Sequence, residues 1–158
     1  MGFFRVRYAV VAGLVVAGAA GLDLYEAHSP DFGVRAAPHA DAPACGRLDR
    51  PERLGGQRRE DVSTPGVGVW GDGAVVLRCG LTPPEPTVDA CIDVDDVDWV
   101  WRETGSESKV LVTYGRDPAV EVEIADRVDA VDAVLVELSR MVKPITQKAK
   151  CIGDGDTL

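Results

Sequence analysis

Five strand-like segments followed by one long amphipathic helix restrict the fold of this chain more than any other feature. The segments are 66–71, 74–79, 98–103, 109–115 and 119–124. In the last segment valines and an isoleucine alternate with Glu121 and Glu123, which predicts one buried and one solvent-facing side. Turn residues at 70–73 and 104–108 favour antiparallel pairing of consecutive strands.

The long helix is predicted over 128–142, where apolar residues recur at spacings of three and four until Pro144 ends the pattern. A shorter helix is expected from Pro43 to Leu48, with Asp41 as its N-cap. Because the strands precede the long helix, the sequence predicts an α+β fold. The expected architecture is a small antiparallel sheet with one or two packing helices, preceded by an N-terminal transmembrane or signal helix.

The N-terminus carries a charge asymmetry that predicts export. Arg5 and Arg7 precede an apolar run of 15 residues, 8–22, and the first acidic residue is Asp23. The length of the run lies between that of a signal-peptide core and that of a full bilayer span. A cleaved signal peptide and an uncleaved anchor therefore both stay open; we favour the anchor, because a tilted helix can include the flanking residues. The expected location is the cell membrane, single-pass with the C-terminal domain outside the cytoplasm, or secretion if the N-terminus is cleaved.

The predicted boundaries divide the chain into three parts. Residues 1–22 are the signal-anchor or signal peptide, 23–42 an extracytoplasmic linker and 43–158 a disulfide-stapled α+β domain. The linker is inferred from its Pro, Ala, His and Asp residues, which show little apolar periodicity.

The charge of the exported part excludes one class of partner. Residues 23–158 hold 15 Lys and Arg against 26 Asp and Glu, a net charge of −11, so no nucleic acid partner is expected. One segment is locally basic and could meet an anionic wall polymer or a lipid headgroup. We favour a solvated face that is partly paired with Asp49, Glu52 and Glu60. The basic residues are Arg47, Arg50, Arg53, Arg58 and Arg59.

Four cysteines suit an oxidising compartment. They are Cys45, Cys79, Cys91 and Cys151. Three pairings are possible. We expect a local bridge between Cys79 and Cys91 around the Pro-rich loop, with Cys45 and Cys151 joining the two ends of the domain.

The sequence lacks the residues that several common catalytic and metal-binding chemistries require. The only histidines, His28 and His39, lie in the predicted linker, so a nucleophile activated by histidine has no base in 43–158. The cysteines contain no CxxC pair, and the acidic residues of 93–98 fail the EF-hand template, which favours a solvated acidic turn. No phosphate-cradling glycine motif is present. The sequence therefore predicts no catalytic residue, cofactor or metal.

Five residues remain as candidates for ligand binding. The tryptophans could form an aromatic platform, with Trp99 and Trp101 on one face of a strand, although core positions are the more common role. The two arginines could meet acidic groups, with structural ion pairs as the alternative. The candidates are Trp70, Arg78, Trp99, Trp101 and Arg116.

Several blocks together resemble the actinobacterial domain of unknown function numbered 3515. The blocks are Cys45, Gly56, Arg58-Arg59, Trp70-Gly71, Val76-Leu77-Arg78-Cys79-Gly80, Val97-Asp98-Trp99 and the stretch from Tyr114 to Val122. The resemblance covers most of 45–151 and leaves the predicted linker and 153–156 outside. It implies a small exported or membrane-anchored envelope protein without an established activity or cofactor.

The expected function is a membrane-tethered extracytoplasmic binding or interaction module of the actinobacterial cell envelope. Its expected partners are the cell membrane and either an envelope protein or an anionic wall polymer. The alternative is a small carboxylate-dependent cell-wall hydrolase or transferase, which would need two carboxylates facing one another across a cleft.

Overall fold

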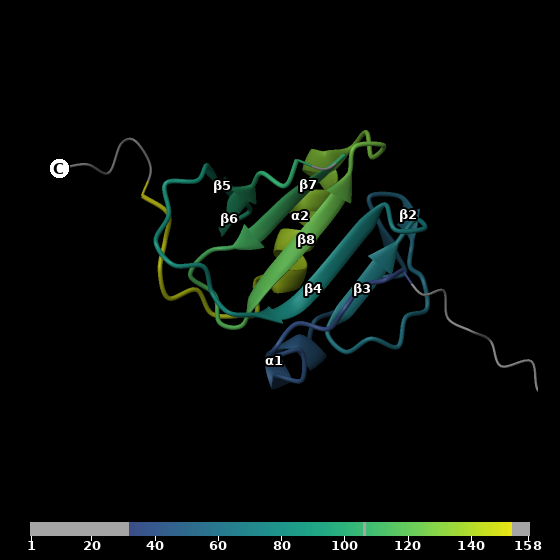
Figure 1. Ribbon diagram of the computed structural model, residues 1–158, viewed down its shortest axis with the longest axis horizontal. Coiled ribbons are helices and arrows are strands. Elements are labelled where there is room, and N and C mark those ends of the chain that lie inside the picture. Colours follow the sequence, from purple (N-terminus) through teal and green to yellow (C-terminus); the bar gives the residue numbers. More distant parts are fainter. Residues whose placement is uncertain (1–31, 106, 153–158) are drawn as a thin grey trace, which may run out of the picture.

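A six-stranded antiparallel sheet and two helices make up most of the computed structural model, which describes residues 32–105 and 107–152 (Figure 1). The strands of this sheet are β3 (Val67–Trp70), β4 (Val75–Leu81), β5 (Cys91–Val94), β6 (Val97–Arg102), β7 (Ser108–Thr113) and β8 (Ala119–Ala125). A separate hairpin contains β1 (Arg53–Leu54) and β2 (Gln57–Arg58), and the helices are α1 (Pro43–Gly46) and α2 (Val131–Val142). The α+β class is confirmed; the predicted N-terminal helix lies outside the described residues.

The strand order, β3-β4-β8-β7-β6-β5, departs from sequential pairing at one point. β3 and β4 form a hairpin, and β5 to β8 form a meander, as expected for consecutive strands. The Pro-rich connection 82–90 then leads from β4 to the far edge of the sheet, and β8 pairs with β4. The prediction of sequential pairing is wrong here, because β4 and β8 both bury alternate side chains completely and so pair with one another inside the sheet.

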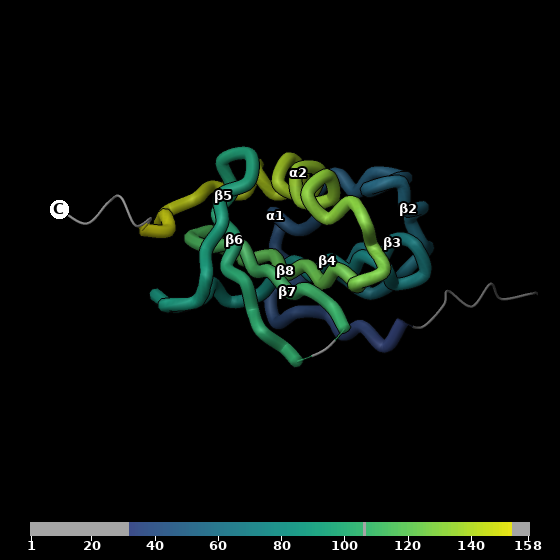
Figure 2. The backbone as a smooth tube through the Cα atoms, turned by 90° about the horizontal axis from the view of Figure 1, so that it is seen from above, coloured from purple at the N-terminus to yellow at the C-terminus, as the bar shows by residue number. Residues whose placement is uncertain are grey.

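Helix α2 covers one face of the sheet, as Figure 2 shows from above. Leu77 and Val122 are opposite one another on β4 and β8, and both are fully buried with Leu138 of the helix. Burying one such side chain contributes about 1.5–3 kcal/mol relative to leaving it exposed. The expected amphipathic helix is therefore confirmed, although it begins at Val131 rather than at residue 128.

The opposite face is crossed by residues 32–42, which run beneath β4 in Figure 2. Ala37 and Ala40 are buried, and the His39 N–H donates to the Gly80 carbonyl oxygen at 2.9 Å. These residues therefore belong to the folded part, although their composition led us to place them in the linker. Small alanines pack against a strand without any apolar periodicity, so the contact could not be predicted from the composition of this segment.

Helix α1 is shorter than expected. Its N-cap is Ala42, without a side-chain cap, so the Asp41 cap is wrong, while Pro43 does lie in the first turn. The chain then turns into the β1–β2 hairpin instead of continuing the helix. Strands of two residues are too short to show an alternation, which is why the sequence did not indicate them.

Gly80 permits the crossing of residues 32–42 over β4. Its φ of +107° lies in the region that favours glycine, at a register shift between Cys79 and Leu81. A β-carbon at this position would lie 2.4 Å from both the His39 carbonyl carbon and the Ala40 nitrogen. No side chain fits there unless the crossing segment moves away from the strand.

Replacing Gly80 with alanine should lower the free energy of unfolding by about 1–3 kcal/mol, because it combines an unfavourable φ with a backbone clash. Denaturant unfolding under non-reducing conditions measures the change. The matched control is Gly46→Ala, where φ is ordinary and no atom lies within 4 Å of the new β-carbon. Equal effects of the two substitutions would contradict the close approach at Gly80.

Candidate functional site

All four cysteines form disulfides within the described chain, but the pairing differs from the expected one. Cys45 pairs with Cys79, with 5.5 Å between their Cα atoms, and Cys91 pairs with Cys151, with 6.3 Å. The expected Cys79–Cys91 bridge is wrong because β4 and β5 are separated by three strands. Cys45 of α1 and Cys79 of β4 meet in the core, and the tail after α2 returns to the edge strand β5.

Tryptic mapping without reduction tests this pairing, because Cys79 and Cys91 lie in one peptide, 79–102. The observed bridges should join that peptide to both 36–47 and 151–158 in one three-peptide species. Further cleavage at Asp89 should then separate a Cys45–Cys79 product from a Cys91–Cys151 product. Two separate species before this cleavage, or free thiols in the native protein, would contradict the pairing.

The tryptophans do not form an aromatic platform. Trp70 and Trp99 are fully buried in the core, so neither offers surface to a ligand. The Trp70 Nε1–H donates to the Pro51 carbonyl oxygen at 2.9 Å, and the Trp99 Nε1–H to the Ser139 hydroxyl at the same distance. Trp101 packs against the same core and keeps part of its surface exposed.

Arg78 lies on the face of the sheet opposite α2, in an ion pair. Its Nε and Nη2 donate to one oxygen of Glu121 at 3.0 and 2.7 Å. Both residues line a shallow hollow of about 390 Å³, together with Glu123 and Arg35. Glu123 accepts a hydrogen bond from the Ser108 hydroxyl at 2.7 Å. The two glutamates are neighbours on one face of β8, so they do not oppose one another across a cleft.

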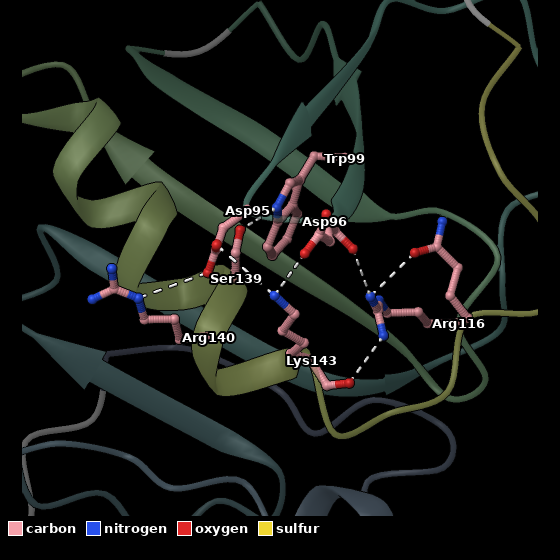
Figure 3. A network of polar contacts seen from close by, with 8 residues as sticks. Asp95, Asp96, Trp99, Arg116, Ser139, Arg140 and Lys143 are labelled. Atoms are coloured by element: carbon pink, nitrogen blue, oxygen red, sulfur yellow. Dashed lines mark hydrogen bonds and ion pairs between the residues drawn. The ribbon is translucent and has the colours of Figure 1, made fainter.

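Arg116 is only 3% exposed and joins three segments of the chain, as Figure 3 shows. Its guanidinium donates to the carbonyl oxygens of Lys143 and Ile145, just beyond α2, and to that of Asp96. It also donates to the Gln147 side chain at 3.1 Å. Burial lowers the pKa of Arg116, and the charge of Asp98 opposes that shift. This arginine therefore holds the end of the helix against the β5–β6 turn and is closed to a ligand.

The acidic residues of 93–98 form the β5–β6 turn, where Asp95 and Asp96 have positive φ values. Asp96 pairs with Lys143 at 2.9 Å, and Asp95 lies 3.7 Å from Arg140 (Figure 3). The hydrogen bond to Lys143 lowers the pKa of Asp96 and raises that of Lys143. Within 32–105 and 107–152, no three His, Cys, Asp or Glu residues are arranged to hold a metal ion.

A different cluster of charged residues does surround a pocket. This pocket of about 480 Å³ lies between the segment after α1 and strand β3. We call it the arginine pocket, and its charged wall consists of Arg50, Glu52, Arg58, Arg59, Glu60 and Asp61. The wall is held to the sheet because Arg59 forms a β-bridge with Trp70 and the Glu60 N–H donates to the Val69 carbonyl oxygen.

Two arginines of this pocket lack a carboxylate partner. Arg59 is paired with Glu52 at 2.6 Å, and the exposed Arg58 has no side-chain hydrogen bond or ion pair among the described residues. Arg50 donates to the Cys45 carbonyl oxygen at 3.2 Å, while its buried Nε has no acceptor. Burial, and secondly the charge of Arg59, lower the pKa of Arg50. An anion bound here would compensate positive charge that the protein leaves unpaired.

The sequence indicated this site only in part. The density of arginines between residues 47 and 59 marked the segment as basic, and one pairing with a nearby acidic residue, that of Arg59 with Glu52, is present. It did not indicate that Arg47 lines a different pocket, beside Glu137 and Arg140. That division depends on the β1–β2 hairpin, which the sequence did not predict.

The fold and its cross-links define a small disulfide-stapled α+β domain, of the kind that forms in oxidising compartments. The chain belongs to the family described as protein of unknown function DUF3515, whose family model matches residues 6–151. The match starts before the apolar run, so it extends over the N-terminal part that the sequence resemblance left outside. No curated protein and no solved structure matches the chain.

The disulfides favour an extracytoplasmic location for the domain. Neither α1 nor α2, the helices of the part that the structure describes, is long and apolar enough to cross a bilayer. The apolar run 8–22, on which the membrane prediction rests, lies outside the described residues.

Replacing Arg116 with methionine should lower the free energy of unfolding by about 1–3 kcal/mol, since buried carbonyl oxygens lose a charged donor. Urea unfolding without reductant measures the loss. Arg102→Met is the control, because Arg102 lies 3.9 Å from Asp89 at the surface and such pairs contribute at most about 1 kcal/mol. An Arg116 effect no larger than that of the control would contradict its structural role.

Proposed function

We propose that this protein is a membrane-tethered extracytoplasmic binding module of the actinobacterial cell envelope. In this proposal the N-terminal segment holds the domain at the membrane, and the arginine pocket binds an acidic group of an envelope component. The observation that carries the binding site is the pair of arginines, Arg50 and Arg58, without a carboxylate partner among the described residues. The two disulfides and the apolar run support the location.

The position of the pocket supports a ligand close to the membrane. Phe32 lies beside the β3–β4 turn, where a side chain on Gly73 would meet its ring at 3.6 Å. The same turn contacts the pocket, since the Gly71 N–H donates to the Arg58 carbonyl oxygen at 2.8 Å. Residues 23–31 span at most about 30 Å when extended. An anchor at 8–22 would therefore keep this end of the domain near the lipid headgroups.

The hydrolase or transferase remains the second candidate, because Glu121 and Glu123 share a hollow with Arg78. The ion pair of Glu121 and the hydrogen bond of Glu123 to Ser108 favour a structural role for these carboxylates. Their position on one strand face also differs from the opposed pair that glycoside hydrolysis uses. These contacts support binding over catalysis.

Co-sedimentation of the full chain with washed envelope fragments tests the proposal. We expect the wild-type protein to bind and Arg58→Gln to bind about tenfold more weakly, because a charged hydrogen bond contributes about 1.5–3 kcal/mol. Arg47→Gln is the matched control: Arg47 is an exposed arginine of the same basic segment, but it lines the other pocket.

Equal binding by wild type and Arg58→Gln would overturn the assignment of the pocket. Degradation of the fragments by the wild-type protein, lost in Glu121→Gln but kept in Arg58→Gln, would favour the hydrolase instead. Protease protection of the domain in intact cells would contradict the extracytoplasmic location.

A further inference from the structure

We infer that the ligand of the arginine pocket is zwitterionic and carries a phosphate and an ammonium group close together. This inference rests on the proposed function and adds the chemical class of the ligand. It starts from the charges that the pocket wall leaves unpaired, which are of both signs.

The wall contains as many acidic residues as arginines. Glu52 and Arg59 neutralise one another at 2.6 Å. Arg50 and Arg58 then remain without a carboxylate, while Glu60 and Asp61 form no ion pair among the described residues. Glu60 accepts only a backbone hydrogen bond, from the Asp72 N–H at 3.2 Å, and Asp61 is exposed. The pocket therefore presents two free positive and two free negative charges.

This balance selects against ligands of a single charge. A polyanion would be attracted by the arginines but repelled by Glu60 and Asp61, and by a chain that carries −9 overall. A simple cation would be attracted by Glu60 and Asp61 but repelled by the arginines. A ligand that joins an anionic and a cationic group can pair with unpaired charges of both signs. A ligand of a single charge is repelled by one set of them, and this repulsion makes the pocket specific.

Phosphate is the anion that the donors fit best. Clusters of guanidinium groups are a recurrent means of binding phosphate, because their planar donors match its oxygens. Thr64 also lines the pocket, so a hydroxyl group is close by. The volume of about 480 Å³ lies within the range of small-molecule sites and exceeds what a single carboxylate needs.

Two sources in an envelope offer this chemistry. One is the phosphoethanolamine headgroup of a phospholipid, and the other is a wall polymer whose phosphates carry amine substituents. Both present a phosphate and an ammonium a few bonds apart, so the pocket chemistry is shared and the experiment must separate the sources.

Three small probes test the contributions of the anionic and the cationic group of the ligand separately. The full chain in detergent is titrated with phosphoethanolamine, glycerol phosphate and ethanolamine by calorimetry. We expect phosphoethanolamine to bind about tenfold more tightly than glycerol phosphate, and ethanolamine to bind most weakly. Arg58→Gln should weaken both phosphates about tenfold. Asp61→Asn should reduce the affinity for phosphoethanolamine to that for glycerol phosphate, and Arg47→Gln should leave all three affinities unchanged.

The outcomes distinguish the two proposals. If both phosphates bind equally and Arg58→Gln weakens both, the anion site stands and the zwitterionic ligand is overturned. If no probe binds, or if Arg47→Gln has the same effect as Arg58→Gln, both the site and the ligand class are overturned. If Asp61→Asn loses the preference for phosphoethanolamine over glycerol phosphate, the result supports both the site and the ligand class, provided that the unfolding midpoints of the variants match that of the wild type.

Vesicles identify the source. The full chain is reconstituted into phosphatidylglycerol vesicles with or without phosphatidylethanolamine. A lipid ligand predicts that phosphatidylethanolamine lowers the apparent affinity for added phosphoethanolamine by competition, and that Asp61→Asn abolishes this effect. Unchanged affinity in both vesicles, with binding of the soluble probe retained, assigns the site to a soluble or polymer-borne group.

Discussion

The pairing of β4 with β8 is the interaction on which the rest of this structure depends. It joins the β3–β4 hairpin to the β5–β8 meander, and it brings Leu77 and Val122 together beneath helix α2. Without this ladder the two halves would each be a small sheet with one exposed apolar face, which is rarely stable in water. The long connection 82–90 is the consequence, because the chain must run from β4 to β5 at the far edge of the sheet.

The cross-links strengthen the two ends of this arrangement rather than its centre. Cys45–Cys79 fastens α1 to the end of β4, and Cys91–Cys151 fastens the tail after α2 to the edge strand β5. Each closes a loop of several tens of residues, for which chain-entropy estimates give about 3–4.7 kcal/mol. Arg116 acts at the second of these ends as a non-covalent tie between the helix and the β5–β6 turn.

The charged side chains differ in whether they have hydrogen-bond or ion-pair partners within the chain. The acidic β5–β6 turn, Arg78 and Arg116 all have partners within the chain, which explains their placement as parts of the fold. In the arginine pocket, by contrast, Arg50 and Arg58 have no carboxylate partner, and Glu60 and Asp61 form no ion pair among the described residues. Charges left unpaired in a concave wall are typical of sites that receive their partners from outside.

Local patterns in the sequence determined the fold class, most of the strands, and the amphipathic helix up to Pro144, since alternation and helical spacing reflect the burial of neighbouring residues. They could not determine the disulfide pairing, the β4–β8 contact or the folding of 32–42 onto the sheet. Each of these joins segments far apart in the chain, and many pairings satisfy the same local pattern. The arginine pocket belongs to this second group: the sequence displayed its arginines, and only the hairpin and β3 decided which of them share one wall.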